Sequence, residues 1–478
     1  MGKHKKVQIS EEENMNKNKY KLPTAYTILF SITVVIGIIT QFIPEINQAS
    51  LSDVLMAPIN GLKDAIDISL YVLLMGGFLG VVNKTGALDA GIGSVVRKLN
   101  GKELFLIPIL MVIFSLGGSG YGMAEETLAF YALITTAMLA AGFDSLTSVA
   151  TILLGAGCGV LGSTVNPFMI ATSIDSLSGV GVETNQATVM MVGVALWASS
   201  LLISMYFVMS YAKKVKEDKK NSILSQEEYK NSQDAFTDDN SEVLEFTPRR
   251  KVVLTLFILS FIIMIMGVIP WERFGINLFV NTDTLLGSSL GNWWFSELAM
   301  WFTIMAVIIG IVYGLKEQEI VSAIIEGASE MVGVALIIGI SRGVSVIMGK
   351  TGLDIFVLSK ASDALTGMSP ILFINIAFLI YILLAFLIPS TSGLASVSMP
   401  IFGPLAASLG FAPEMVISVL SAGSGLVNLI TPTSGVVMGG LAIAKVDYST
   451  WIKFVSKVIL CIYISSAIIL SIGMMFIK

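Results

Sequence analysis

The sequence has very few of the residues that build metal and catalytic centres. One of its 478 residues is histidine, His4, and two are cysteines, Cys158 and Cys461, each inside an apolar run. So few ligands argue against a histidine–cysteine metal cluster, a histidine-based triad and a disulfide framework. We therefore expect no catalytic residues, no metal site and no cofactor.

Charge is scarce as well. Only 13% of the residues are charged and 54% are hydrophobic, with a mean hydropathy of +0.82. These values lie far outside the range of soluble domains of this length and predict a polytopic membrane protein in contact with lipid. No basic patch with interleaved aromatic residues is present, so we expect no nucleic-acid partner.

Charge and hydropathy divide the chain into four parts. We predict a cytoplasmic tail at 1–22, a first membrane repeat at 23–212, a cytoplasmic linker at 213–251 and a second membrane repeat at 252–478. Both ends of the linker are rich in lysine and arginine, which indicates the cytoplasmic side. The predicted location is a bacterial plasma membrane, with the N-terminus in the cytoplasm.

The first repeat contains an acidic pair inside an apolar region. Residues 104–141 are apolar on both sides of a glycine-rich motif that carries Glu125 and Glu126. The arm before this motif, 104–116, is shorter than the roughly 20 helical residues that cross a bilayer. We therefore predict a re-entrant hairpin with the motif at its tip, because irregular backbone within a membrane must lie in protein or line a cavity.

Three further features follow the same logic. Residues 145–180 form an apolar run interrupted at Gly162–Pro167, which predicts a discontinuous helix. Residues 370–409 predict a second hairpin with its tip at Pro389–Gly393, and 415–444 a second broken helix, interrupted at Asn428–Gly435.

These features recur in the same order in both halves of the chain. Lys84-Thr85-Gly86 matches Lys350-Thr351-Gly352 at an offset of 266 residues, and Asn166-Pro167 matches Thr431-Pro432 at an offset of 265. With the tail and the linker both predicted in the cytoplasm, two predicted crossings precede the first hairpin and three separate the linker from the second. The two hairpins therefore open to opposite sides of the membrane, and the repeats are predicted to be inverted. An all-α fold of two inverted repeats with hairpins and broken helices predicts a secondary transporter that works by alternating access.

Several motifs resemble those of one family. The runs Gly162–Phe168, Ser341–Val346, Ser392–Pro400 and Leu429–Val436 are similar to those of YfcC-like basic amino acid antiporters, in the C4-dicarboxylate anaerobic carrier family of the ion transporter superfamily. The resemblance implies a scaffold domain that usually dimerises, a mobile transport domain, and arginine/ornithine exchange in some relatives. Sodium-dicarboxylate relatives carry Ser-Asn-Thr at tips and breaks, a pattern from which this chain departs.

The candidate substrate-binding residues lie at the tips, at the breaks and in one span. Glu125 and Glu126 can pair with a cationic substrate, or be solvated in a vestibule. Arg342 is a partner of these glutamates, a clamp for a carboxylate or a structural counter-ion. The others either bind substrate or cap broken helix ends: Ser119, Ser163, Thr164, Asn166, Ser390, Thr391, Ser392, Asn428, Thr431, Thr433 and Ser434.

The charge asymmetry of the two tips favours a cationic cargo. The first tip carries carboxylates and the second carries only hydroxyls, so we predict a transporter of small charged amino acids, most concretely an arginine/ornithine antiporter. The alternative is a carrier of C4-dicarboxylates or other organic anions, coupled to sodium or protons. A channel and an intramembrane enzyme fit less well, because broken-helix repeats around a closed site are typical of carriers.

Overall fold

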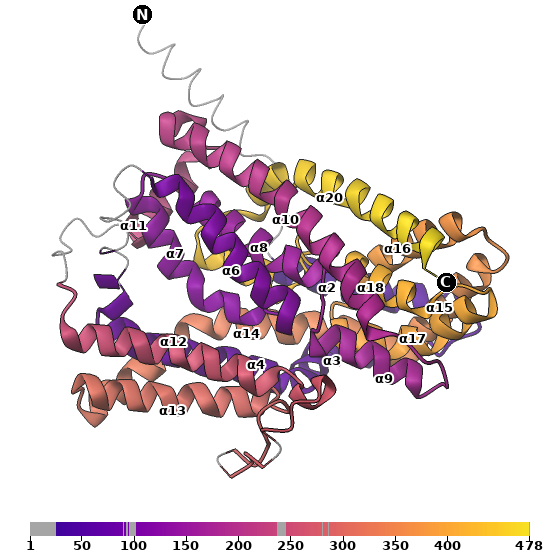
Figure 1. Cartoon of the computed structure of the whole chain (residues 1–478), viewed down its shortest axis with the longest axis horizontal. Helices are drawn as coiled ribbons and strands as arrows, with labels where there is room; N and C mark the ends of the chain where they lie inside the picture. The colour runs from indigo at the N-terminus through magenta and orange to yellow at the C-terminus, as the bar shows by residue number, and fades with distance from the viewer. Residues whose placement is uncertain are drawn as a thin grey trace, which may run out of the picture.

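The computed structural model describes residues 25–88, 90, 91, 94, 102–236, 245–279, 281–284 and 286–477. These residues form helices and connecting segments (Figure 1). Eight of the described helices are long and apolar enough to cross a membrane. The prediction of an all-α, multi-pass membrane protein is therefore confirmed. The predicted tail, 1–22, lies outside the described residues.

The helices pack in two groups. In the first, α14 runs against α2, α3 and α4, while α13 packs against both α4 and α12. Figure 1 shows α4, α12 and α13 running alongside one another. The first helix group comprises α2 (Ala25–Thr40), α3 (Leu51–Asp64), α4 (Ile66–Lys84), α12 (Pro248–Val268), α13 (Phe295–Tyr313) and α14 (Glu317–Thr351).

The second helix group contains both predicted hairpins and both broken helices. Its members pack chiefly on one another, with α8 and α18 near the centre and α10 and α20 along one edge (Figure 1). It comprises α6 (Leu106–Tyr121), α7 (Leu128–Ala140), α8 (Ser145–Leu161), α9 (Thr172–Ser178), α10 (Gln186–Glu217), α16 (Pro370–Leu387), α17 (Thr391–Ser408), α18 (Pro413–Val427), α19 (Gly435–Ile443) and α20 (Tyr448–Phe476). Helix α15 (Leu353–Leu365) contacts both groups.

All four predicted interruptions are present. The chain leaves helical geometry between α6 and α7, between α8 and the short helix η3 (Pro167–Ala171), between α16 and α17, and between α18 and α19. Proline cannot donate a backbone hydrogen bond, and the polar residues beside it satisfy the groups that the break leaves free. The composition of these segments therefore predicts their position well.

The first arm of the first hairpin is longer than predicted. Helix α6, preceded by η1 (Glu103–Phe105), continues through most of the glycine-rich motif to Tyr121, so by length and composition it could cross a membrane. The glycines permit close packing instead of a loop: a Cβ atom on Gly118 would lie 2.1 Å from the carbonyl oxygen of Ala156 in α8. The segment before α4 also contains a helix, α3, that was not predicted.

Two contacts join positions separated by about the repeat offset. Ser69 Oγ of α4 donates to the carbonyl oxygen of Ala335 in α14, 266 residues away. A Cβ atom on Gly425 of α18 would lie 2.3 Å from the Cα atom of Leu161 in α8. A two-fold relation between the repeats would bring such equivalent positions together. The inversion of the repeats stays a prediction.

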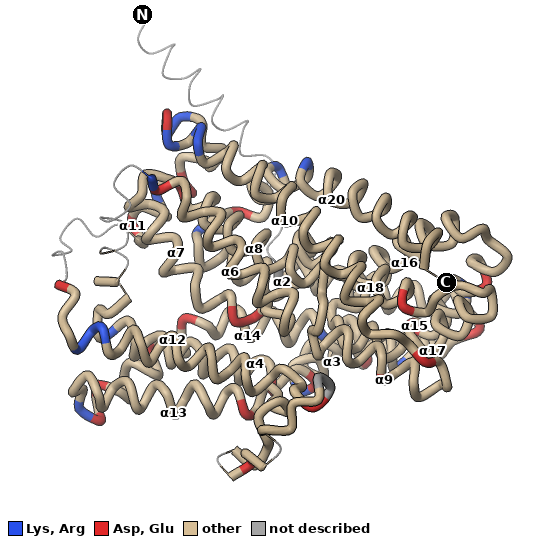
Figure 2. The backbone as a smooth tube through the Cα atoms, viewed as in Figure 1, with Lys and Arg blue, Asp and Glu red and all other residues tan. Residues whose placement is uncertain are grey.

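The predicted linker is partly folded onto the helices. Helix α10 extends to Glu217 and is followed by η4 (Lys219–Asn221) and α11 (Gln226–Phe236). The carboxylate of Glu228 in α11 accepts hydrogen bonds from the backbone nitrogen of Asp447 (2.8 Å) and from Thr450 Oγ1 (3.1 Å) of α20. Figure 2 shows lysine and arginine gathered at the end of α10 and the start of α12.

Candidate functional site

A cavity of about 180 Å³ lies where the two helix groups meet. The second group contributes both hairpin tips and both helix breaks to its wall. The first group contributes Ala65 and Ile68 next to and within α4, Phe295 of α13, and residues of α14. The cavity therefore gathers the four irregular segments that the sequence singles out, although two come from each half of the chain.

The first hairpin tip owes its shape to Gly122. This residue has φ of +82°, a left-handed conformation that glycine adopts without strain, and its backbone nitrogen donates to the carbonyl oxygen of Gly118 (3.1 Å). A Cβ atom here would lie 2.6 Å from Asn166 Oδ1 at the first helix break. The tip and the break can therefore touch only because residue 122 has no side chain.

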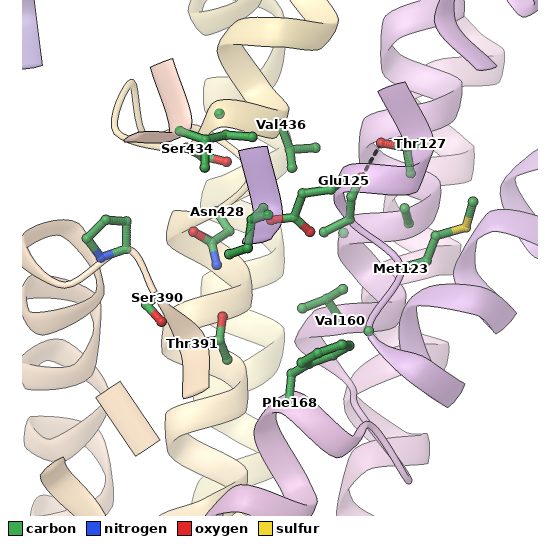
Figure 3. A pocket seen from close by; sticks show the side chains of 18 of the residues that line it. Met123, Glu125, Thr127, Val160, Phe168, Ser390, Thr391, Asn428, Ser434 and Val436 are labelled. Carbon is green, nitrogen blue, oxygen red and sulfur yellow. Dashed lines mark hydrogen bonds between the residues drawn. The ribbon is translucent and has the colours of Figure 1, made fainter. Parts of the chain in front are cut away.

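The acidic pair begins the return arm of this hairpin. Glu125 and Glu126 form the short helix η2 (Glu125–Thr127) directly before α7, and both line the cavity. Figure 3 shows the Glu125 carboxylate directed into the cavity, toward the side on which Asn428 lies. An acidic residue in the first turn of a helix is stabilised by the helix dipole.

Glu126 is held more tightly than Glu125. Glu126 is only 3% exposed, and its Oε2 atom accepts a hydrogen bond from the backbone nitrogen of Ala124 (3.1 Å). Tyr71 of α4 lies close to this carboxylate, and its hydroxyl is buried. Glu125 is half-buried and is therefore the more accessible carboxylate.

The first helix break is stabilised by its own polar side chains. Asn166 Oδ1 accepts from the backbone nitrogen of Phe168 (3.0 Å), and its amide donates to Ser163 Oγ (3.0 Å). Ser119 Oγ of α6 donates to the carbonyl oxygen of Gly162 (2.9 Å) and lies 3.1 Å from Thr164 Oγ1. These bonds satisfy backbone groups that would otherwise be buried unpaired.

The second break uses a different set of partners. The carbonyl oxygens of Leu429 and Ile430 accept hydrogen bonds from Trp451 Nε1 (2.9 Å) and from the Tyr448 hydroxyl (2.6 Å) of α20. Ser434 begins α19 as its N-cap and Ser390 begins α17 in the same way. Both N-termini lie at the cavity, where their free N–H groups favour negative charge.

Arg342 lies on α14 and forms an ion pair with Asp64 at the end of α3. Its contact with this aspartate, rather than with the acidic tip, distinguishes among the roles predicted from the sequence: the ion-pair partner in this conformation is Asp64. The two helices approach closely because Gly61 and Gly343 meet between them, and a Cβ atom on Gly61 would lie 2.2 Å from the backbone nitrogen of Gly343.

Ten of the fourteen predicted site residues line the cavity, and four do not. Those in the wall are Glu125, Glu126, Asn166, Arg342, Ser390, Thr391, Ser392, Asn428, Thr433 and Ser434. Ser119, Ser163 and Thr164 bond the first break, and Thr431 lies with its Oγ1 2.7 Å from Thr433 Oγ1. In this conformation these four residues lie outside the cavity wall and form hydrogen bonds at the two helix breaks.

Sequence reasoning missed the aromatic side of the cavity and the partner of Arg342. Phe168 follows the first break and stacks on Phe295 of α13, with ring centroids 5.5 Å apart. Phe168 directly follows the Asn-Pro motif, which was a usable signal. Asp64 and Ile338 had no such signal, because the contact of Asp64 with Arg342 and the position of Ile338 in the cavity wall depend on how α3 and α14 pack.

The cavity has an acidic side and a side with helix N-termini. The Arg342 charge is offset by Asp64, whereas no cationic side chain is within salt-bridge distance of Glu125 or Glu126 among the described residues. The same part of the chain contains no group of three or more His, Cys, Asp or Glu that could hold a metal ion. The acidic side therefore presents carboxylates to the cavity with no cationic partner among the described residues.

Comparison with known proteins finds two relatives that match most of the chain. A protein of Haemophilus influenzae described as uncharacterized is 33% identical over 433 residues, covering 89% of this chain and 79% of that protein. YfcC of Escherichia coli K12, named provisionally as a basic amino acid antiporter, is 28% identical over 416 residues, covering 85% of this chain and 77% of YfcC.

Two solved structures are also similar. The YdaH transporter of Alcanivorax borkumensis is 15% identical with a TM-score of 0.49, covering 95% of this chain and 99% of that one. MtrF of Neisseria gonorrhoeae, described as illuminating a class of antimetabolite efflux pumps, is 18% identical with a TM-score of 0.47, covering 94% and 95%. A family model described as the C4-dicarboxylate anaerobic carrier, DcuC, matches residues 50–475. The chain therefore belongs to the C4-dicarboxylate anaerobic carrier family of membrane transporters.

Proposed function

We propose that this protein is a secondary transporter of small charged amino acids, most concretely an arginine/ornithine antiporter. The observation that carries the proposal is the charge of the cavity: Glu125 and Glu126 both line it and Glu125 is accessible, while Arg342 is paired with Asp64. A carboxylate at this depth is costly unless it meets a partner, and a guanidinium or ammonium group supplies one.

The opposite side of the cavity suits the other end of an amino acid. The N-terminus of α17, capped by Ser390, and that of α19, capped by Ser434, lie across from the acidic tip. Figure 3 shows Ser390, Thr391 and Asn428 on this side and Glu125 on the other. The cationic side chain of such an amino acid would meet the acidic tip, and its carboxylate would meet the helix N-termini.

Alternating access would come from movement of one helix group against the other. The cavity wall is shared between the groups, so a shift of the second group would carry both tips and both breaks along with the substrate. We infer that the second group is the transport domain and that the first, built around α4 and α14, is the scaffold and forms the homodimer contact. Rigid-body movement of one bundle against the other is how inverted-repeat carriers alternate access.

A second candidate is a carrier of C4-dicarboxylates or other organic anions, coupled to sodium or protons. It is favoured by Arg342 and by the helix N-termini at the cavity, which would bind two carboxylates. The acidic pair stands against it, because a dianion would meet Glu125 and Glu126.

Counterflow in proteoliposomes separates the two candidates. Vesicles containing the purified protein are loaded with ornithine, and the entry of labelled arginine is measured; loading with succinate, and imposed sodium and proton gradients, form the parallel series. We expect arginine to enter only vesicles loaded with ornithine or arginine. Entry of labelled succinate without entry of arginine would show that the second candidate is right. Glu317→Gln, an exposed residue at the start of α14, is the control and keeps full exchange.

A further inference from the structure

Arg342 lies between two cavities. A second cavity, of about 300 Å³, adjoins α14 and the second hairpin, and Arg342 lines both this one and the cavity described above. The reason is helical spacing: Ile338, Ser341, Arg342 and Ser345 recur at intervals of three and four residues and so form one stripe along α14. The first three line the first cavity, and Arg342 and Ser345 line the second.

The ion pair between Arg342 and Asp64 is accessible to water. The side chains are 28% and 47% exposed respectively, and Asp64 also lines the second cavity. Accessible ion pairs contribute little net stability, because water and dissolved ions compete for both partners. Another carboxylate that reaches Arg342 with better geometry can therefore displace the aspartate.

The surroundings of the guanidinium favour an anion. Its Nη1 atom lies 3.6 Å from where a Cβ atom of Gly393 would be, and Gly393 is in the first turn of α17, where its backbone nitrogen donates to Ser390 Oγ (3.2 Å). A guanidinium and the positive end of a helix converge here, and this arrangement is unfavourable without a negative partner. Ser345 Oγ is also buried and forms no hydrogen bond to any described residue.

From this geometry we propose that Arg342 binds the carboxylate of the cargo, and that the cargo carboxylate takes the place of Asp64. The inference rests on the proposed function, and it assigns the two ends of the amino acid: the cationic side chain meets Glu125 and the carboxylate meets Arg342. Asp64 is then an internal stand-in for the cargo, which neutralises Arg342 while the site is empty.

Displacement of Asp64 also changes the contact between α3 and α14. Asp64 ends α3 and Arg342 belongs to α14, so displacing Asp64 releases one link between these helices at the partition between the cavities. Lys350 and Asp53 form another ion pair between the same two helices; Lys350 lines the second cavity, and Asp53 lines neither cavity. The chain thus supplies its own matched control for the loss of an interhelical ion pair.

Binding of arginine and of its decarboxylated analogue, agmatine, tests the inference. The full-length protein in detergent is given labelled arginine, which unlabelled arginine or agmatine then displaces. We expect wild-type protein to bind agmatine about 10- to 150-fold more weakly, the range for charge-assisted hydrogen bonds to one carboxylate. Arg342→Gln should weaken arginine to the level of agmatine and leave agmatine unchanged. Asp64→Asn should tighten arginine, because the internal competitor is gone, and Asp53→Asn should change neither ligand.

The outcomes separate this inference from the proposed function. Wild-type protein that binds neither ligand shows that both are wrong. Equal binding of arginine and agmatine by the wild type, or an equal loss of both in Arg342→Gln, overturns the carboxylate assignment alone. Arg342→Lys, which retains a charge without the planar fork, gives an intermediate ratio and serves where the glutamine variant fails to fold. Weaker arginine binding in Asp64→Asn would show a structural ion pair and not an exchangeable one.

Discussion

Replacing Glu125 with glutamine removes the accessible charge from the acidic tip while preserving the size of the side chain. Glu125 is half-buried and directed into the cavity (Figure 3), whereas Glu126 is 3% exposed and accepts a hydrogen bond from the backbone of Ala124. The two substitutions should therefore differ. A glutamine at 126 can still accept the Ala124 bond through its amide oxygen, but a glutamine at 125 cannot pair with a cation.

The expected size of the effect follows from the interaction that is lost. A hydrogen bond to a charged group contributes about 1.5–3 kcal/mol, which corresponds to about 10- to 150-fold in Kd. We expect Glu125→Gln to weaken arginine binding by this factor and Glu126→Gln by less than about tenfold. Equilibrium binding of labelled arginine to purified protein measures both, with Glu317→Gln as the control for a lost carboxylate in a helix first turn.

Melting temperatures should accompany these binding measurements, so that a loss of fold is not taken for a loss of affinity. If Glu125→Gln binds arginine as well as the wild type while Glu126→Gln does not, the assignment of the accessible carboxylate is wrong. If both bind normally, the acidic tip has no part in recognition.

Other predictions concern the supports of the cavity. Gly122→Ala should destabilise the fold by about 2–3 kcal/mol, from left-handed strain and a displaced Asn166 cap, and thermal unfolding measures it; an unchanged melting temperature would contradict the account of the tip. Trp451→Phe should cost about 1–3 kcal/mol by leaving the Leu429 carbonyl unpaired, and Tyr463→Phe, at a partly buried position of the same helix, is a control expected to be silent in the same assay. Glu228→Ala should speed proteolysis of the linker without changing arginine affinity, since it removes the acceptors of the bonds from Asp447 and Thr450; equal cleavage rates would refute this. The hydrogen bond from Lys350 lowers the pKa of Asp53 from 3.8 to about 2, so the stability that this pair contributes is complete above the ordinary value and lost as the pH falls toward 2. The melting difference between wild type and Asp53→Asn should therefore be constant near neutral pH and shrink in acid.

The sequence predicted the irregular segments well, for a physical reason. Pro167, Pro432 and the polar residues beside them interrupt apolar runs, and such residues within a membrane must lie where protein or a cavity satisfies them. Glycine was less informative, because it serves two purposes. Gly122 forms a turn, as predicted, whereas Gly118 stays helical and lets α8 approach.

The features that sequence reasoning missed depend on packing between distant helices. Asp64 and Arg342 are 278 residues apart, and only the close crossing at Gly61 and Gly343 brings them together. Helix α3 itself had a readable signal, since Ser50 and Asp53 form a capping box at its start. Its interior contains Pro58 and several polar residues, and these conceal the helix in a hydropathy pattern.

The central claim is that one cavity between the helix groups holds a cationic amino acid with its side chain at Glu125. A structure determined in the presence of arginine tests it most directly. The prediction is arginine between the two hairpin tips, with its guanidinium beside Glu125 and its carboxylate beside Arg342. Arginine bound in the reverse orientation, or anywhere outside this cavity, would contradict the claim.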